Sequence, residues 1–463
     1  LNVEALNNLG LALEGQYKFK PALSIYQECF SIAPNNAAIN NNLGKLFFKL
    51  SNFDAAIWHI KKSISIKPSS VTAHYNLCEL YEKTNNIKKL TATVSKALIE
   101  TNSDPQIRLK KGQLEFRKKE YKKSIITLQS IPETEIPKAR RSVLFEILGK
   151  SFDYCKSYNE AFYYFKKMNS IFSESLKSSS VQEGRYLALV KKLRESFASD
   201  SKSYRVKSIS QSKVTPIFLI GFPRSGTTLL DTVLRSHSMI DVIEEKPLIN
   251  QLVIDAGGFV DQRLLSQFTA AQIKSFEKKY LKKIKKLLPD RTTNGLVIDK
   301  LPLNIIHVQL IQKVFPKAKF ILLLRHPYDC ALSCFMQNFQ LNDAMENFLD
   351  LGKTAQLYSE VMTLWTTYSK CFDLNVKTIK YENLITDFEN TTKSILSFLE
   401  LNWDTNLHNF SKTGRDRNRI NTPSYNQVTE KLYRRSIGRW KNYEDHFFND
   451  CKVLQQWVKK YNY

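Results

Sequence analysis

Small and apolar residues recur every 34 positions in the first part of the chain. The clearest copies are Leu9-Gly10, Ala22, Tyr26 and Pro34, which return as Leu43-Gly44, Ala56, Ile60 and Pro68. Weaker copies contain Leu77-Cys78 with Val94, Gly112 with Leu128, and Leu148-Gly149 with Phe165. Small residues at fixed positions let two antiparallel helices approach, and a proline ends the second helix of the first two copies. Residues 1–170 are therefore predicted to form an α-solenoid of stacked helix pairs.

The pattern changes after residue 214, where short apolar runs alternate with helix-compatible segments. Strands are predicted at Ile217–Ile220, Leu296–Ile298, Lys319–Leu324 and Val376–Lys380. Strands that alternate with helices form a parallel sheet flanked by helices, with binding groups at the carboxyl ends of the strands. The polar residues just past these ends are Arg224, Lys300, Arg325 and Tyr381. Residues 214–463 are thus expected to be an α/β domain, preceded by a helical, charged linker over residues 171–213.

The first strand runs into a loop that has the character of a phosphate cradle. The spacing of Gly221, Gly226 and Thr228 fits the P-loop frame G-x-x-x-x-G-K-[ST], but Thr227 stands where the lysine belongs. Backbone N–H groups at the start of the following helix can hold an anion. Without the lysine, the P-loop-like frame argues against phosphoryl transfer, and Arg224 is the nearest cation.

Composition sets the remaining bounds. The net charge of +25 on 463 residues favours anionic partners, or else reflects a lysine-rich solvated surface. Nucleic-acid binding is not expected, because no recognition module accompanies the charge. The seven cysteines are scattered, which fits a reducing compartment and core thiols; a zinc site at Cys330 and Cys334 is the weaker alternative, and no metal is expected.

No run of about 18 apolar residues predicts a membrane span, so a cytoplasmic location is expected. Leu1 opens in the middle of a helical pattern, which leaves an upstream anchor or further repeats open.

Two motifs, each placed after a predicted strand, resemble the sulfotransferase family, whose donor is 3′-phosphoadenosine 5′-phosphosulfate (PAPS). They are Phe-Pro-Arg-Ser-Gly-Thr-Thr, ending at Thr228, and Leu-Leu-Leu-Arg-His-Pro, followed by Ser333. The similarity covers roughly residues 214–445 and is strongest to the tyrosylprotein and repeat-containing bacterial branch. The first part of the chain is similar to tetratricopeptide repeats, and the bacterial members have the same two-domain arrangement.

The resemblance implies a set of donor-binding residues. The loop residues Arg224, Ser225, Gly226, Thr227 and Thr228 would hold the 5′-phosphosulfate, and Arg325 with Ser333 the 3′-phosphate. Further donor contacts are implied for Tyr381, Ser424, Arg435, Gly438 and Arg439, with the choice between the two arginines open. One position departs from the pattern: Gln337 stands where relatives with protein substrates carry an arginine, which puts donor affinity and the acceptor in question.

The resemblance also implies the catalytic residues. Glu245 is the general base that takes the proton of the acceptor hydroxyl, and Lys300 stabilises the leaving phosphate oxygen, with Arg224 bracing the phosphosulfate. His237 is a rival base, because other branches of the superfamily use histidine. Asp299 could orient Lys300 or cap the next helix.

The sequence leaves the acceptor open among a protein tyrosine, a glycan and a small molecule, with a protein partner in the repeat groove as a further expectation. The alternative interpretation is a tetratricopeptide scaffold whose second domain binds nucleotide but is inactive. A P-loop phosphoryl-transfer protein is a third, and Thr227 in the lysine position counts against it.

Overall fold

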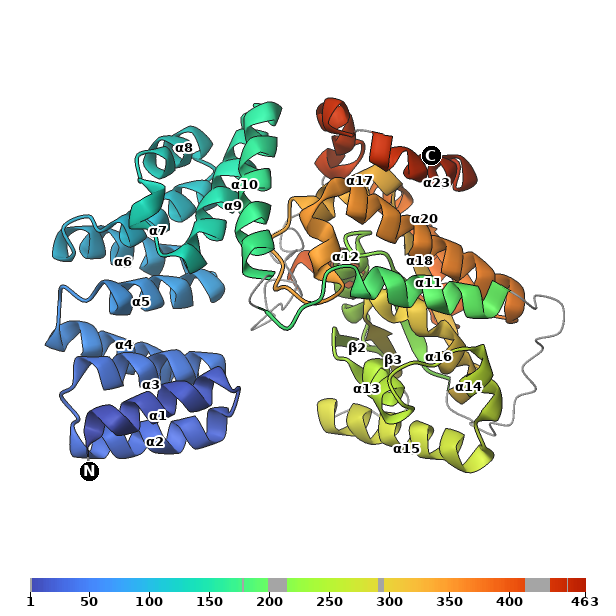
Figure 1. Ribbon diagram of the computed structural model, residues 1–463, viewed down its shortest axis with the longest axis horizontal. Helices are drawn as coiled ribbons and strands as arrows, with labels where there is room; N and C mark the ends of the chain where they lie inside the picture. Colours follow the sequence, from blue (N-terminus) through green and yellow to red (C-terminus); the bar gives the residue numbers. More distant parts are fainter. Residues whose placement is uncertain (1, 177–178, 199–214, 290–294, 413–433, 448) are drawn as a thin grey trace. The chain divides into compact units, whose positions relative to one another are not determined.

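The computed structural model describes residues 2–176, 179–198, 215–289, 295–412, 434–447 and 449–463. The chain divides into two compact units, Leu1–Met168 and Asn169–Tyr463 (Figure 1). Each unit encloses hydrophobic clusters of its own. None of the helices within the described ranges is both long and apolar enough to cross a membrane.

The first unit is a series of helix pairs, which confirms the predicted repeats. Each pair folds back on itself through a short turn. The pairs are α1 (Val3–Gly15) with α2 (Phe19–Ile32), α3 (Ala37–Lys49) with α4 (Phe53–Ile66), α5 (Val71–Lys83) with α6 (Ile87–Glu100), α7 (Pro105–Arg117) with α8 (Tyr121–Gln129), and α9 (Lys138–Tyr154) with α10 (Tyr158–Leu176). The 3₁₀ turn η1 (Glu133–Glu135) precedes the last pair, and the end of α10 belongs to the second unit.

A small residue on the first helix of each pair explains the close approach of the second. A Cβ added to Gly10 would lie 2.4 Å from the ring of Tyr26, and one added to Gly44 would lie 2.4 Å from Ile60. The same clash recurs at Gly112 and Gly149. The glycine and the large side chain opposite it are therefore a matched pair in four of the five helix pairs, and Cys78 takes the position of the glycine in the third.

The helix ends follow the same period of the sequence. A polar N-cap side chain accepts hydrogen bonds from the first turn of α1, α3, α5 and α7, at Asn2, Asn36, Ser70 and Asp104. The turn inside each pair contains a residue with positive φ, at Tyr17, Ser51, Asn85, Lys119 and Lys156. Local capping and turn geometry thus support the repeat that the apolar pattern predicts.

The second unit is built on a parallel sheet, as predicted. Five strands in the described residues run in the order β2-β3-β1-β4-β5. All neighbouring strands pair in parallel. Their bounds are β1 (Ile217–Gly221), β2 (Ile240–Glu244), β3 (Leu296–Lys300), β4 (Lys319–Leu324) and β5 (Asn375–Lys380).

Helices cover both faces of this sheet. On one face, Leu219 and Ile298 lie in a core cluster with side chains of α12 and α20. On the other, Phe218 stacks on Phe320 and contacts Tyr280 of α15. The helices and 3₁₀ turns are α11 (Arg185–Ala198), α12 (Thr227–Arg235), α13 (Leu248–Asp255), α14 (Gln262–Gln267), α15 (Ala270–Leu287), η2 (Pro302–His307), α16 (Val308–Val314), α17 (Pro327–Phe335), η3 (Met345–Leu349), α18 (Leu351–Cys371), α19 (Tyr381–Thr386), α20 (Phe388–Phe398), η4 (Thr405–Asn409), η5 (Arg434–Ser436), η6 (Arg439–His446), η7 (Asn449–Leu454) and α23 (Gln455–Lys460).

Two features differ from the sequence-based expectation. Strand β2 was not predicted, because its core, Ile-Asp-Val-Ile, is too short to separate from a loop. Helix α11 lies within the range expected as a linker but packs on α18 inside the second unit. Phe197 makes an edge contact with Tyr368 at 5.2 Å between ring centroids, and Arg194 pairs with Glu360 at 3.0 Å.

Candidate functional site

Every strand of the sheet delivers a predicted site residue at its carboxyl end. Glu245 follows β2, Lys300 is the last residue of β3, the loop with Arg224 follows β1, Arg325 follows β4, and Tyr381 follows β5. Because the carboxyl ends of parallel strands lie at one edge of the sheet, the strand order sets the order in which these residues follow one another along that edge. The expected base Glu245 and the expected catalytic cation Lys300 lie on the β2–β3 side of the loop, and the expected 3′-phosphate residues lie on the β4–β5 side.

The loop after β1 leaves hydrogen-bond donors unused at the start of α12. The N–H groups of Gly226, Thr227 and Thr228 donate to no group among the described residues. The Ser225 side chain is 1% exposed, and its Oγ also has no partner in the described part of the chain. Buried donors around a helix N-terminus are suited to an anion. This local chemistry fits the phosphosulfate that the loop is expected to hold.

Gly226 fixes the shape of this loop. Its φ is +102°, and an added Cβ would lie 2.3 Å from Cδ2 of Tyr381. A side chain here would be strained by the backbone and would also strike the Tyr381 ring. The loop is therefore held against the end of β5 by a contact that only glycine permits.

Arg224 connects the loop to the next strand and helix. Its backbone is in the left-handed region, with φ at +67°. Its Nε donates to Ser333 Oγ on α17 at 3.1 Å, and its carbonyl accepts a hydrogen bond from Arg325 at 2.9 Å. The structure thus brings Arg224 of the first motif together with Arg325 and Ser333 of the second, which follow it by 101 and 109 positions.

Arg325 is a buried cation at the expected 3′-phosphate end. It is 7% exposed, and its guanidinium carbon lies 5.0 Å from the centre of the Tyr381 ring. Burial opposes its charge, but Asp329 and the other acidic neighbours outweigh that effect and raise its pKa, so it stays protonated. Its Nε has no hydrogen-bond partner among the described residues, which leaves a charged donor for a ligand.

The C-terminal segment closes onto this cation. The carbonyl of Ser436 accepts from Arg325 at 2.6 Å, and Ser436 Oγ lies 2.7 Å from the Tyr381 hydroxyl. Asp329 of α17 anchors the segment, because its two carboxylate oxygens accept hydrogen bonds from the N–H groups of Gly438 at 2.7 Å and Trp440 at 2.9 Å.

Neither Ser436 nor Asp329 was among the sequence-predicted site residues, although Asp329 lies one helical turn after Arg325. The predicted donor contacts Arg435 and Arg439 flank this segment, in η5 and η6. Ser424 lies outside the described residues. Gln337 comes just after α17, where its N–H donates to the carbonyl of Cys334.

At the other end, Lys300 sits among three carboxylates. Its Nζ lies 3.0 Å from Glu245, 3.4 Å from Glu244 and 3.8 Å from Asp231 of α12. Lys300 is completely buried, and the Glu244 side chain is 7% exposed, whereas that of Glu245 is 33% exposed. Of the two adjacent glutamates, Glu245 is therefore the one that a substrate can reach.

Backbone geometry turns Glu245 toward the lysine. Its φ is +49°, and its N–H donates to the carbonyl of Lys300 at 2.8 Å. This hydrogen bond continues the β2–β3 ladder by one residue past Glu244, which pairs with Lys300 in register. A left-handed conformation in a non-glycine residue is uncommon and costs free energy. The cost is concentrated at the residue expected to act as the base.

Two alternatives from the sequence do not fit the structure. In His237, Nδ1 accepts a hydrogen bond from the N–H of Met239 at 3.1 Å, and Nε2 lies 3.0 Å from the carbonyl of Asn402. Both ring nitrogens are therefore engaged in hydrogen bonds to the backbone. Asp299 neither orients Lys300 nor caps a helix. Successive side chains of a strand point to opposite faces, and Asp299 accepts from the Tyr280 hydroxyl at 3.1 Å on the far face.

The two cysteines of α17 are core thiols in the described structure. Cys334 donates to the carbonyl of Pro223 at 3.5 Å, and Cys330 lies near the carbonyl of Arg325. Burial raises the pKa of Cys330 to about 12. Within the described ranges, no cluster of three histidine, cysteine or acidic side chains could hold a metal ion.

Comparison with known proteins identifies the class of both units. Residues 216–405 match the model of the sulfotransferase family. Residues 3–36 and 37–70 each match the model of the tetratricopeptide repeat. The second unit therefore contains a sulfotransferase-family domain, and the first is built from tetratricopeptide repeats.

The similar individual proteins are distant. An uncharacterized protein of Aquifex aeolicus (strain VF5) is 29% identical over 335 residues, which are 70% of this chain and 43% of that protein. Protein-tyrosine sulfotransferase 1 of Danio rerio is 25% identical over 222 residues, 43% of this chain and 57% of that protein. The chain thus spans about half the length of these curated relatives. The solved sulfotransferase domain of the Synechococcus PCC 7002 olefin synthase aligns with a TM-score of 0.41 at 19% identity, over 57% of this chain and 99% of that chain.

Proposed function

We propose that this protein transfers a sulfuryl group from PAPS to a hydroxyl group of an acceptor. The observation that carries the proposal is the order of groups along one sheet edge. An accessible glutamate paired with a buried lysine, an anion loop with unused donors, and a buried arginine follow one another from β2 to β4. An acceptor, a phosphosulfate and a 3′-phosphate need these groups in this order.

The donor would be held by residues of the loop and of the second motif. The N–H groups of residues 226–228 and Ser225 Oγ bind the 5′-phosphosulfate, and Arg224 braces it. Arg325, Ser333 and the segment around Ser436 receive the 3′-phosphate, with Tyr381 against the nucleotide. When bound, PAPS supplies the sulfuryl group and a phosphate leaving group.

Glu245 takes the proton of the acceptor hydroxyl at its carboxylate, which makes the oxygen nucleophilic. Lys300 is placed to neutralise the negative charge that develops on the leaving phosphate oxygen. Lys300 is completely buried, and its contacts with three carboxylates fix its position before substrate binds. Substrate binding would shift its contact from Glu245 toward the phosphate and free the carboxylate as a base.

For the acceptor we propose a hydroxyl on a peptide tyrosine, a glycan or a small molecule. The similarity to protein-tyrosine sulfotransferases supports the first of these. The repeat unit would then bind a protein partner, since the concave face of a helical solenoid is its usual binding surface.

The test is sulfuryl transfer from radiolabelled PAPS to pools of tyrosine peptides, glycans and phenols. Glu245→Gln keeps the size of the side chain but removes the base, and we expect kcat to fall by about 10²–10⁴-fold. Glu244→Gln is the matched control, because it alters the neighbouring carboxylate on the same lysine; it should lower kcat by less than about tenfold.

Full activity of Glu245→Gln would exclude it as the base. Equal losses in both variants would assign the effect to the charge around Lys300. Donor binding without transfer to any pool would favour the inactive-domain alternative.

A further inference from the structure

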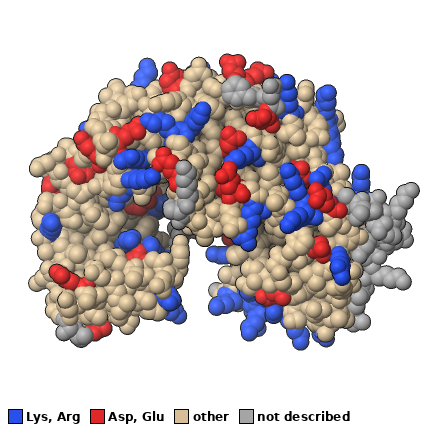
Figure 2. Space-filling model, viewed as in Figure 1, with Lys and Arg blue, Asp and Glu red and all other residues tan. Residues whose placement is uncertain are grey.

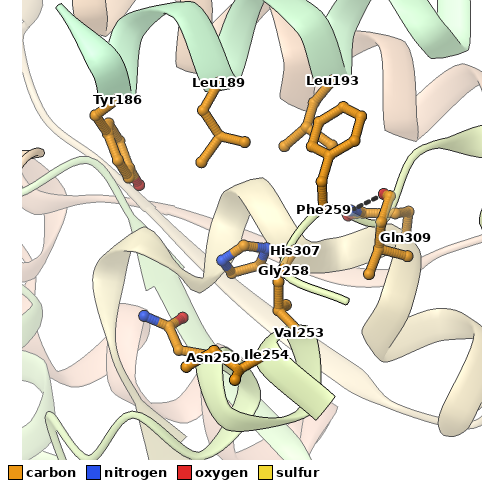
Figure 3. A pocket seen from close by; sticks show the side chains of 11 residues that line it. Tyr186, Leu189, Leu193, Asn250, Val253, Ile254, Gly258, Phe259, His307 and Gln309 are labelled. Atoms are coloured by element: carbon orange, nitrogen blue, oxygen red, sulfur yellow. Dashed lines mark hydrogen bonds between the residues drawn. The ribbon is translucent and has the colours of Figure 1, made fainter. Parts of the chain in front are cut away.

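A cavity away from the strand ends lies between α11 and the segments that follow Glu245 and Lys300. Its volume is about 200 Å³ (Figure 3). Leu189 and Leu193 of α11 form one wall, and Val253 of α13 with Phe259 of the next loop form the other. The helix α11 precedes residues 216–405, so this cavity is partly built by a segment outside the family-matched part of the chain.

Polar groups without partners face this apolar space. His307, at the end of η2, is 9% exposed, and its ring nitrogens have no hydrogen-bond partner among the described residues. Burial lowers its pKa to about 4, so the ring is neutral at physiological pH and offers one donor and one acceptor. Figure 3 shows the Tyr186 hydroxyl and the Asn250 amide directed into the same space.

Gln309 gives an independent indication that the cavity can receive a hydrogen-bond donor. It is completely buried, and its amide nitrogen donates to the carbonyl of Val260 at 3.1 Å. Its Oε1 has no partner within the described residues, and Gln309 is one of the residues that line the cavity. A buried carbonyl oxygen without a hydrogen bond costs free energy that a ligand donor would recover.

We propose that this cavity binds a small uncharged molecule that has an apolar body, such as a single ring, and a hydroxyl or similar polar group. None of the eleven lining residues carries a charge at neutral pH, which excludes anionic ligands such as the donor. A cavity of about 150 Å³ lined by aliphatic and aromatic side chains can hold benzene, so the observed volume suits a ring with one substituent. The proposal does not depend on the sulfotransferase activity.

Two of the segments that line this cavity follow the expected catalytic residues closely in the sequence. The helix α13 begins three residues after Glu245, and His307 follows Lys300 by seven residues. A ligand here would contact both segments that leave the base and the cation, together with α11.

The probe is p-cresol, measured by saturation-transfer NMR and calorimetry on the full chain. We expect a site in this cavity with a dissociation constant of about 1 mM or tighter, counted apart from any p-cresol bound at the proposed acceptor site beside Glu245. Toluene, which lacks the hydroxyl, should bind about tenfold more weakly, and benzoate should not bind. Leu189→Trp fills the cavity and should abolish binding, whereas Lys191→Trp, the same change on the exposed side of α11, should not.

Far-UV circular dichroism and a cooperative thermal transition report whether each variant is folded, and binding of 3′-phosphoadenosine 5′-phosphate is measured separately. As a second measurement, p-cresol should shift one histidine ring signal of the unsubstituted chain, and that signal should be absent in His307→Gln.

No binding of p-cresol at about 5 mM would overturn the proposal, as would binding that is the same in Leu189→Trp and the unsubstituted chain or that shifts no ring signal of His307. Binding of p-cresol by a chain that does not bind the nucleotide would keep the cavity proposal and reject the proposed function.

Discussion

Adjacent residues on β3 serve opposite faces of the sheet. Lys300 points toward α12 and the carboxylates of the site, and Asp299 points toward Tyr280 of α15. Sequence adjacency suggested that the two act together, but the alternation of a strand separates them. Asp299 is thus a completely buried acid outside the proposed chemistry.

We expect this residue to make stability depend on pH. Burial raises the pKa of Asp299 to about 7, from an ordinary value of 3.8. Between these values the folded state keeps a proton that the unfolded state has lost, so stability falls as pH rises through this range. In Asp299→Asn the loss of stability between about pH 5 and pH 7 should shrink by on the order of 1 kcal/mol per pH unit. Urea unfolding at both pH values measures it.

The control for that experiment is Asp241→Asn on the neighbouring strand β2, which should leave the pH dependence unchanged. If Asp299→Asn and the unsubstituted chain lost stability equally over the same range, the buried carboxyl would be ionised in the folded state.

At the scale of elements, the sequence predicted what local patterns determine. The run Lys319–Leu324 was predicted with the bounds that β4 has, because a continuous apolar segment between turn residues marks a buried strand. The glycine period predicted the helix pairs, since each glycine meets a large side chain on the next helix.

The sequence did not predict the features that depend on distant contacts. Strand β2 is five residues long and is completed by pairing with β3, fifty-six positions later in the chain, as the Glu244–Lys300 register shows. The hydrogen bonds from the N–H groups of Gly438 and Trp440 to Asp329 join segments more than a hundred residues apart, so no local sequence pattern predicts them. Glu245 was placed by resemblance; its backbone conformation follows only from this pairing.

We expect Asp329 to keep the C-terminal segment in place over Arg325. Asp329→Ala removes both acceptors, so the amides of Gly438 and Trp440 should exchange hydrogen about tenfold faster or more. Asp350→Ala, which removes the N-cap acceptor of α18, is the control and should leave these two amides unchanged. Hydrogen exchange followed by mass spectrometry over residues 434–443 measures the effect. Unchanged exchange in Asp329→Ala would mean that other contacts hold the segment.

At the scale of the molecule, part of the positive charge lies outside the candidate site. Helix α15 buries Ile273, Phe276 and Tyr280 and exposes lysines along its other side. Figure 2 shows basic side chains gathered over this helix. The exposed lysines are Lys274, Lys278, Lys279, Lys282, Lys285 and Lys286. Some of the +25 net charge is therefore a solvated helix face, as one of the two sequence interpretations held.

The charge that matters for the proposed function is instead buried. Lys300 and Arg325 are enclosed at the carboxyl ends of the two strands that flank β1, namely β3 and β4, where low exposure strengthens their interaction with anions. A ligand with phosphates at both its 5′ and 3′ positions would engage the loop and Arg325 together.

Calorimetry with 3′-phosphoadenosine 5′-phosphate and AMP tests this account most directly, because the two nucleotides differ only in the 3′-phosphate. Hydrogen bonds to charged groups contribute about 1.5–3 kcal/mol each, so two such bonds at Arg325 and Ser333 predict at least about 100-fold tighter binding of the bisphosphate, without magnesium. Equal affinity for the two nucleotides, or tighter magnesium-dependent binding of ATP, would contradict the account.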